Sequence, residues 1–266
     1  MIAKFGDVGE GVALLQRRLT RAGFAVPETH VYDQATVRAV KALQADRGLV
    51  VDGIAGPKTF VALSAGRLEH HLTAADLEKA AAALGVELAA VRAVNEVESM
   101  GHGMLPEGKA VILFERHVFW KRLEAAGIDP APAAAKWPSL VSRERGGYHG
   151  GSAEYVRLRT ACMIDRAAAL ESCSWGAFQI MGYHWQALGY ASVDEFVERM
   201  DKSEGEQLEA FVRFIANDKG LLAALKARQW AKFARLYNGP AYAENLYDIK
   251  LARAYAKYAG EDKAAA

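Results

Sequence analysis

The spacing of apolar residues predicts two groups of helices that meet near residue 66. One apolar stripe with the period of a helix ends before Gly23, and a second follows Asp33, which suits an N-cap, and ends before Gly48. A short third helix begins at Pro57, a residue that is well tolerated at the first helical position. The pattern therefore predicts a small three-helix domain over residues 1–66.

A polar connector at 67–72 leads to a larger domain, predicted over residues 73–266. Its second helix has the sequence ELAAVRAVNEVES. At 100° per residue, Val91 and Val94 share a face with Glu98, while Glu96 points the opposite way and can pair with Arg92 on the surface. Burial raises the pKa of a carboxyl group, and a raised pKa suits an acid that protonates a departing sugar oxygen. The alternative is a partly buried glutamate that binds a nearby arginine.

The run KAVILFERHVFW is rich in β-forming residues and predicts a strand. Alternation along that strand puts Glu115 at the end of one apolar face, where a second cleft carboxylate can lie. The alternatives are a structural ion pair between Glu115 and Arg116, and His117 as the catalytic group. The Pro- and Gly-rich segment 128–150 is long enough to be functional, and we expect it to wall a cleft.

The stretch SWGAFQIMG combines an apolar core pattern with polar and flexible residues. We expect a helix over residues 152–172 to lead directly into it. Within it, Ser174 and Gln179 are the polar side chains, and glycines occupy positions 176 and 182. Glu171 precedes this stretch and competes with Glu98 for the role of acid, although its helix gives it no clear inward direction. Nearer the C-terminus, the sequence YNGP contains Tyr237 and Asn238 and predicts a stop between two helices.

Composition excludes several classes of protein and partner. The formal net charge of +1 over 266 residues gives no bulk electrostatic argument for binding nucleic acid. No apolar run reaches the roughly 20 residues that span a bilayer, and the start of the chain lacks the features of a signal peptide. Cys162 and Cys173 are predicted core thiols in a reducing compartment, and the sequence shows no metal-ligand pattern. We therefore expect no cofactor, no metal and no stable membrane insertion.

The sequence of residues 6–64 resembles the small peptidoglycan-binding module found at the ends of cell-wall hydrolases. The match rests on four signature residues, Asp52, Gly53, Gly56 and Thr59. The two glycines also permit the turn between the second and third helices. Both longer helices contain a Leu-Gln step, at Leu15-Gln16 and Leu43-Gln44, which hints at an internal duplication. The alternative interpretation is a three-helix bundle that binds no ligand.

Residues 72–260 resemble the lysozyme superfamily and, more narrowly, the N-acetylmuramidase domain of modular phage endolysins. The resemblance rests on VNEVES, ILFERHVFW, SWGAFQIMG and YNGPAYAENLYD. It implies a mainly α fold with a small β element, in which Glu98 is the catalytic acid and Glu115 the second carboxylate. It also implies five substrate-binding residues, which are Ser174, Gln179, Tyr183, Tyr237 and Asn238. The glycines around Gln179 would then let backbone and sugar approach closely.

The resemblance implies an enzyme that hydrolyses the β-1,4 bond between N-acetylmuramic acid and N-acetylglucosamine. Its partner would be bacterial peptidoglycan, and we expect a monomer. Without an export signal, it would accumulate in the host cytoplasm and reach the wall after a separate membrane lesion. Two alternatives stay open. A lytic transglycosylase uses the same acid but leaves anhydro-muramic ends, and a wall-anchoring protein on an inactive scaffold does not cleave the bond.

Overall fold

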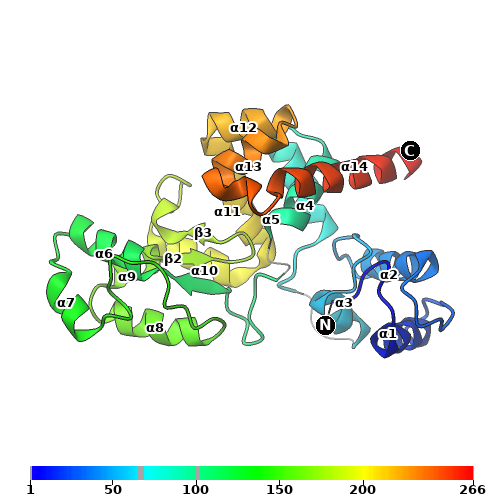
Figure 1. Ribbon diagram of the computed structural model, residues 1–266, viewed down its shortest axis with the longest axis horizontal. Helices are drawn as coiled ribbons and strands as arrows, with labels where there is room; N and C mark the ends of the chain where they lie inside the picture. Colours follow the sequence, from blue (N-terminus) through cyan, green and yellow to red (C-terminus); the bar gives the residue numbers. More distant parts are fainter. Residues whose placement is uncertain (1, 65–68, 100–101, 266) are drawn as a thin grey trace. The chain divides into compact units, whose positions relative to one another are not determined.

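Helices dominate both parts of the chain in the computed structural model, which describes residues 2–64, 69–99 and 102–265 (Figure 1). Tertiary contacts divide the chain into two units, Met1–Lys79 and Ala80–Ala266. The division falls within helix α4 (Ala74–Leu84), C-terminal to the predicted linker at 67–72. The predicted boundary at residues 66 and 67 itself lies outside the described residues.

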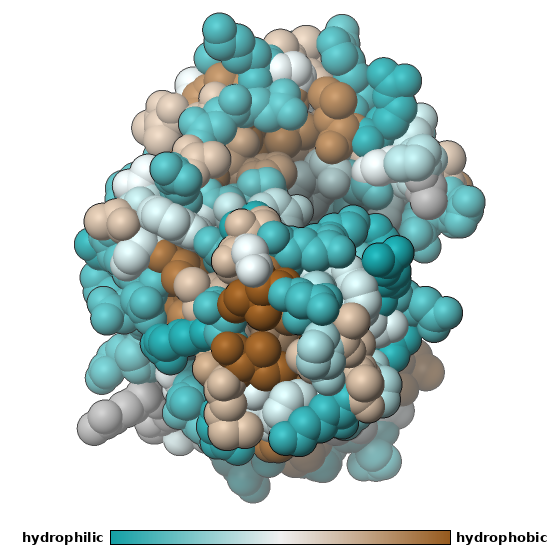
Figure 2. Space-filling model, turned by 90° about the vertical axis from the view of Figure 1, so that its left-hand side faces the viewer, coloured by the Kyte–Doolittle hydropathy of each residue, from teal (hydrophilic) through white to brown (hydrophobic). Residues whose placement is uncertain are grey.

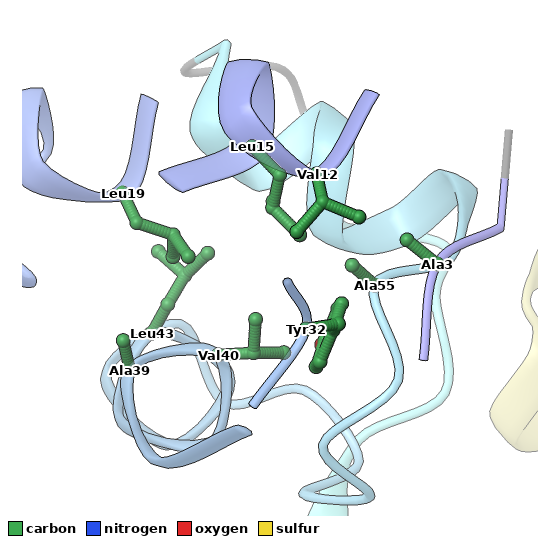
Figure 3. Close-up of a cluster of buried hydrophobic side chains, with 9 residues drawn as sticks. All are labelled: Ala3, Val12, Leu15, Leu19, Tyr32, Ala39, Val40, Leu43 and Ala55. Atoms are coloured by element: carbon green, nitrogen blue, oxygen red, sulfur yellow. The ribbon is translucent and has the colours of Figure 1, made fainter. Parts of the chain in front are cut away.

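The first unit contains the three predicted helices, followed by the first part of α4. The helices are α1 (Glu10–Arg21), α2 (Gln34–Asp46) and α3 (Pro57–Leu63). As predicted, the Asp33 carboxylate caps α2 by accepting the N–H of Thr36 at 2.8 Å, and Pro57 opens α3. Figure 3 shows the core that these elements enclose, in which Leu15, Leu19 and Leu43 are fully buried. The helical stripes in the sequence therefore identified this core.

The second unit combines many helices with a small sheet. Its α-helices are the end of α4, then α5 (Leu88–Glu98), α6 (Arg116–Ala125), α7 (Ala131–Lys136), α8 (Ala153–Cys162), α9 (Arg166–Glu171), α10 (Val193–Lys202), α11 (Glu204–Asn217), α12 (Lys219–Lys226), α13 (Trp230–Asn238) and α14 (Tyr247–Ala265). Short 3-10 turns, η1 (Gly182–His184) and η2 (Pro240–Ala243), add to these. Figure 1 shows α6–α9 grouped on one side of the sheet and α12–α14 on the other. The predicted mainly α fold with a small β element is confirmed.

The sheet has three short antiparallel strands in the order β1 (Ile112–Phe114), β2 (Cys173–Trp175) and β3 (Ile180–Met181). Phe114 pairs with Cys173, and Trp175 pairs with Ile180. The stretch SWGAFQIMG is therefore a β-hairpin, β2 and β3 with a tight turn between them. The hairpin presents the turn residues to the helices of the second unit.

The strand predicted before residue 120 is shorter than expected, and the single helix predicted after residue 152 is divided in two. The strand ends at Phe114, and α6 starts immediately, with Glu115 as its N-cap residue. The predicted helix over 152–172 is two helices, because the Asp165 carboxylate accepts the N–H of Ala168 and starts α9 afresh. Both differences lie at caps, where one residue changes the backbone direction. The segment 128–150 also contains a helix, α7, that its proline content concealed.

A buried ion pair fastens the sheet to the segment that follows α7. Glu154 and Arg157 are both buried, with 2.7 Å between carboxylate and guanidinium. The Glu154 carboxylate accepts the backbone N–H groups of Phe114, His149 and Gly150. Burial alone raises a carboxyl pKa, but these donors outweigh it and lower the pKa of Glu154. Figure 2 views the molecule from the left-hand side of Figure 1, and the most hydrophobic atoms on that face gather near its centre, with smaller hydrophobic areas elsewhere on a largely hydrophilic surface.

Helix α14 packs along α5, although many residues separate them in the chain. Ala89 and Ala93 of α5 form a buried cluster with Ala254 and Tyr258 of α14. The small alanine side chains let the two helix backbones approach closely, and Tyr258 is almost completely buried between them. Helix α14 therefore holds the helix that ends at Glu98.

Candidate active site

Glu98 is the last residue of α5, on the face that also carries the buried Val91 and Val94. The predicted inward direction of this carboxyl is confirmed. Burial raises the pKa of Glu98 to about 7, while the hydrogen bond from Asn238 and the charge of Lys250 moderate the rise. The acid therefore keeps its proton to near-neutral pH, which is what proton donation to a leaving group requires.

Glu96, two residues earlier, has the opposite environment. It is exposed, as predicted, and its carboxylate oxygen Oε2 lies 2.9 Å from the Lys257 ammonium. The Tyr258 hydroxyl donates a hydrogen bond to the same oxygen at 2.6 Å. The partners on α14 were not predicted, because the sequence placed only Arg92 near this carboxylate.

Two residues at the end of α13 connect the acid to the hairpin. Asn238 donates from Nδ2 to Glu98 Oε1 at 3.0 Å, and Tyr237 donates its hydroxyl to the backbone oxygen of Phe178 at 3.0 Å. Gly239 has a φ of 80° and stops the helix there, as the YNGP pattern predicted. The end of α13 thus binds both the acid, through Asn238, and the turn between β2 and β3, through Tyr237.

Ser174 and Gln179 bind each other across the hairpin. The Ser174 hydroxyl donates to Gln179 Oε1 at 2.7 Å, and Gln179 Nε2 donates to the backbone oxygen of Gly176 at 2.8 Å. Gln179 also has a φ of 50°, in the left-handed region. A side chain held at both ends and a backbone in this conformation fix the shape of the turn before any ligand arrives.

The glycines of SWGAFQIMG make room for the protein itself rather than for a sugar. A Cβ atom at Gly176 would lie 2.5 Å from the side-chain carbon Cδ of Gln207, and one at Gly182 would lie 2.3 Å from the backbone oxygen of Leu170. The expected close approach of backbone is therefore present at Gly182. The expected approach of sugar at these glycines is not supported by their surroundings.

An open groove of about 680 Å³ runs past these residues. Glu98, Gln179, Tyr183, Tyr237 and Asn238 all line it, so the structure brings together five of the predicted site residues. The other described lining residues are Val97, Ser99, Phe178, Ile180, Met181, His184, Phe214 and Tyr247. Ser174 is buried behind Gln179 and reaches the groove only through it. An apolar and aromatic lining with a few polar groups is typical of sites that bind small molecules.

Glu115 lies outside this set of lining residues. Its carboxylate oxygen Oε2 accepts the Tyr148 hydroxyl at 2.9 Å and lies 3.1 Å from Nδ1 of His117. Arg116 points elsewhere, donating to the backbone oxygens of Glu144 and Arg145. The anticipated pair of Glu115 with Arg116 is therefore replaced by contacts to His117 and Tyr148. Segment 128–150, expected to wall the cleft, contributes Tyr148 to this cluster and no described residue to the groove.

Both carboxylate oxygens of Glu171, the alternative candidate for the acid, accept hydrogen bonds. Arg122 donates to its Oε2 at 2.6 Å, and the Trp185 indole N–H donates to its Oε1 at 2.8 Å. The side chain is only 12% exposed and is absent from the groove's described lining. Because an arginine and an indole occupy its two oxygens, Glu171 is a structural anchor.

In the first unit, three of the four predicted signature residues, Asp52, Gly53 and Thr59, lie against the buried side chain of Gln44. Its Oε1 accepts the N–H groups of Asp52 and Gly53, and its Nε2 donates to Asp52 Oδ1 at 2.7 Å. Thr59 Oγ1 lies 3.5 Å from the same nitrogen. Gly53 has a φ of 73°, and Gly56 is the N-cap residue of α3. The signature thus fixes the turn between α2 and α3.

The hinted duplication is visible in the hydrogen bonds of Gln16. Gln16 Oε1 accepts the N–H groups of Thr29 and His30, while Nε2 donates to Val31 O and to Thr36 Oγ1. These partners stand in the same order as those of Gln44. His30 even shares the left-handed backbone of Gly53, with a φ of 61°. The turns after α1 and α2 are therefore held by the same pattern of hydrogen bonds to a glutamine, although the two loops differ in length.

Comparison with known proteins assigns the second unit to a family. A family model described as N-acetylmuramidase matches residues 87–259, more than half of the chain. The chain belongs to the N-acetylmuramidase family. A second model, of a peptidoglycan-binding domain, matches residues 8–63 of this muramidase-family chain. The groove with Glu98 and the turn braced by Gln44 lie within these two matched regions.

Relatives of this N-acetylmuramidase-family chain include phage endolysins. The crystal structure of an endolysin of Burkholderia phage AP3 is 58% identical, with a TM-score of 0.92 over 97% of this chain and 99% of that one. The endolysin of Enterobacteria phage PRD1 is 34% identical over 117 residues, 41% of this chain and 72% of that protein. An N-acetylmuramoyl-L-alanine amidase of Bacillus licheniformis is 49% identical over 67 residues. This chain spans only 19% of that amidase's length.

Sequence reasoning missed three residues that shape the site. Gln207 is buried, accepts the N–H of Ala177 and donates to the backbone oxygens of Gly103 and Met200. His184 lines the groove, and burial lowers its pKa, so it is neutral at pH 7. Lys250 acts on Glu98 from α14. Nothing in the local pattern separates Gln207 from an ordinary helical glutamine, whereas His184 follows SWGAFQIMG closely enough to have been considered.

The described part of the chain shows neither a metal-binding cluster nor a helix suited to crossing a membrane. Over these residues, no three or more histidine, cysteine, aspartate or glutamate side chains are arranged to hold a metal ion. None of the described helices combines the length and apolar composition that crossing a membrane requires. Both cysteines are free thiols, Cys173 buried and Cys162 partly buried.

Proposed function

We propose that this chain is a peptidoglycan hydrolase that cleaves the β-1,4 bond between N-acetylmuramic acid and N-acetylglucosamine. One observation carries the proposal, which is a carboxyl that stays protonated to about pH 7 in an open groove lined by aromatic and amide side chains. Membership of the N-acetylmuramidase family and likeness to phage endolysins support the choice of substrate and a role in bacterial lysis.

In this mechanism, Glu98 donates its proton to the glycosidic oxygen as the bond to the sugar breaks. Asn238 keeps the carboxyl oriented through Oε1 and, because its hydrogen bond favours the ionised form, also stabilises the carboxylate left after transfer. Gln179 and Tyr183 bind the sugars on the hairpin side of the groove. Tyr237 positions the turn, because its hydroxyl is already donated to Phe178.

We further propose that residues 8–63 bind the wall and hold the catalytic unit near its bonds. The match to a peptidoglycan-binding domain supports this role. Asp52, Gly53, Gly56 and Thr59 serve it by fixing the turn between α2 and α3 around Gln44. Tethering to an insoluble polymer raises the local concentration of cleavable bonds without any change at the active site.

Mass spectrometry of the products from purified peptidoglycan tests the reaction. Hydrolysis adds water and leaves reducing muramic acid ends. Anhydro-muramic ends would identify a lytic transglycosylase instead, and reducing N-acetylglucosamine ends would move the cut to the other glycosidic bond. An absence of any new ends, with wall binding intact, would identify a binding protein.

A further inference from the structure

A second hollow adjoins the groove on the side formed by α5 and α14. It has a volume of about 450 Å³, and its lining residues are Glu96, Val97, Lys250, Arg253, Ala254 and Lys257. Val97 lines both the hollow and the groove that contains Glu98. Three of the six lining residues are cationic and one is anionic, so the hollow attracts negative charge.

The single carboxylate of the hollow is already neutralised. Lys257 Nζ lies 2.9 Å from Glu96 Oε2, and the Tyr258 hydroxyl donates to the same oxygen. The excess positive charge therefore belongs to Lys250 and Arg253. Both are exposed, and among the side chains described up to residue 260 no carboxylate forms an ion pair with either. They are three positions apart on α14 and so face the same way.

The hollow is also linked to the groove through Lys250. Its ammonium lies 5.5 Å from the centre of the Tyr247 ring, and Tyr247 lines the groove. The charge of Lys250 reaches Glu98 strongly enough to act on the pKa of that carboxyl. A strand bound in the groove would therefore pass within reach of this cation.

In a peptide-bearing N-acetylated glycan strand, the lactyl carboxyl of each muramic acid is joined to its peptide by an amide bond, so the sugars carry no charge. Negative charge along a peptidoglycan strand comes from the free carboxylates of the short peptides attached to its muramic acid residues. A cationic hollow that shares a wall with the sugar groove can therefore engage a strand electrostatically only through those peptides. Exposed cations bind carboxylates weakly one at a time, but two of them on one helix face act together.

We propose that the hollow beside Lys250 and Arg253 binds the carboxylates of a peptide carried by the strand in the groove. The proposal rests on the proposed action on wall glycan, and it adds a requirement for peptide-bearing substrate. It predicts that the enzyme prefers strands that keep their peptides over strands whose peptides an amidase has removed and whose freed lactyl carboxyls have been capped as amides.

Binding to two soluble substrates tests the proposal in the full-length chain. The probes are peptide-bearing glycan strands and the same strands after amidase treatment, with the freed lactyl carboxyls of muramic acid capped as amides. Both are titrated into Glu98→Gln protein, which binds without cutting and has no Glu98 pKa for Lys250 to alter. The peptide-bearing strand should bind more tightly. Adding Lys250→Ala and Arg253→Ala should shrink the ratio of the two Kd values by about fivefold to tenfold, the scale of two exposed charge pairs. Lys250→Arg with Arg253→Lys should keep the ratio.

A charge-matched control removes Arg159 and Lys219, which are exposed on α8 and α12. That control should leave the Kd ratio unchanged. The proposal is overturned if the control lowers the ratio equally, or if the Lys250/Arg253 variant keeps it. Loss of binding to vesicles of anionic phospholipid, with the Kd ratio kept, would assign the hollow to a lipid surface instead. Because binding is measured without cleavage, failure of the proposed hydrolysis would appear separately, as wild-type protein that binds strands but releases no new ends.

Discussion

At the scale of single residues, the burial of Glu98 affects both its chemistry and the stability of the fold. Burial that keeps its carboxyl protonated near neutrality also makes the ionised form unfavourable in the folded state. The folded-state pKa, about 7, lies above the ordinary value of 4.5. The favourable contribution of the protonated group is therefore complete below pH 4.5 and is lost as the pH rises through 7. At higher pH, this residue destabilises the protein.

Glu98→Gln should separate the role of Glu98 in proton donation from its effect on the free energy of unfolding. Loss of the proton donor should lower kcat/KM on peptidoglycan by roughly 100-fold or more. Relative to wild type, the variant's free energy of unfolding should rise between pH 4.5 and 8, by at most about 3 kcal/mol for a shift of this size. Activity assays and thermal unfolding over that pH range measure both. A variant that cuts walls at the wild-type rate would place the acid elsewhere, with Glu171 tested next.

Asn238 should set the alkaline limb of the pH–rate profile. Its hydrogen bond lowers the pKa of Glu98, so Asn238→Ala should raise that pKa and move the limb of kcat/KM to higher pH. Asn238→Asp should move it further, because a like charge opposes ionisation of Glu98. Lys250 and the phenol groups of Tyr237 and Tyr247 are unchanged in both variants. An alkaline limb that stays in place in both would show that another group controls it.

One variant with two measurements decides whether the role of Glu115 is structural or catalytic. The hydrogen bond that it accepts from Tyr148 and its contact with His117 indicate a structural role, so Glu115→Gln should lower the unfolding free energy by about 1 kcal/mol. Activity per folded molecule should stay within about twofold of wild type, since the rate change of a general base is far larger. A severe loss of activity with unchanged stability would instead make Glu115 the second catalytic carboxylate.

Residue-level prediction succeeded where a local pattern carried the information. The helical period alone placed Glu98 inward, and the NGP step placed Asn238 at a helix end. The contact between Glu98 and Asn238 joins residues 140 positions apart, so only the family resemblance connected them. Gln207 could not be recognised, because its partners at Gly103 and Met200 are set by tertiary packing.

At the scale of elements, the hairpin β2–β3 depends on close backbone packing. Gly182 follows β3 and lies against the backbone of Leu170 and Glu171 at the end of α9. The turn between the strands is held by Ser174 and Gln179. Apolar residues in this stretch indicated a buried segment but gave no period, and the strands are too short for alternation to show. The sequence therefore identified the stretch as important without indicating its conformation.

Gly182→Ala should destabilise the second unit. Its Cβ would lie 2.3 Å from the backbone oxygen of Leu170, and backbone cannot move aside as a flexible side chain can. We expect a loss of about 1–3 kcal/mol in unfolding free energy. Gly260→Ala in α14 is the matched control, because no atom lies within 4 Å of a Cβ there, and it should be neutral or stabilising. Equal melting temperatures for wild type and Gly182→Ala would disprove the packing argument.

At the scale of the whole molecule, the proposed wall binding and the proposed cleavage belong to separate units of the chain. The core of the first unit is formed by α1, α2 and α3 together with short connecting segments. The acid, its amide partner and the hairpin all belong to the second unit. The two-part organisation was readable from the sequence because each part has its own apolar pattern and its own family resemblance.

A truncated chain that begins at Arg67 should fold and cut soluble wall fragments at nearly the rate of the full chain. On intact sacculi it should be slower by roughly tenfold or more, because the tether is lost. Circular dichroism checks folding, and release of reducing ends from both substrates checks activity. Equal rates on sacculi would show that the first unit is not a working anchor. An unfolded product would show that the second unit needs residues before Arg67.

The packing of α14 along α5 affects when the acid can form during synthesis. The ribosome delivers Glu98 long before Asn238, Ala254 and Tyr258, the residues that orient its carboxyl and hold its helix. Until those residues emerge, α5 lacks the partner that buries Ala89 and Ala93, and Glu98 is an ordinary solvated carboxyl that is ionised at neutral pH. The proton donor is therefore among the last features of the molecule to be completed, and a growing chain carries the first unit, the proposed wall anchor, well before its acid is formed.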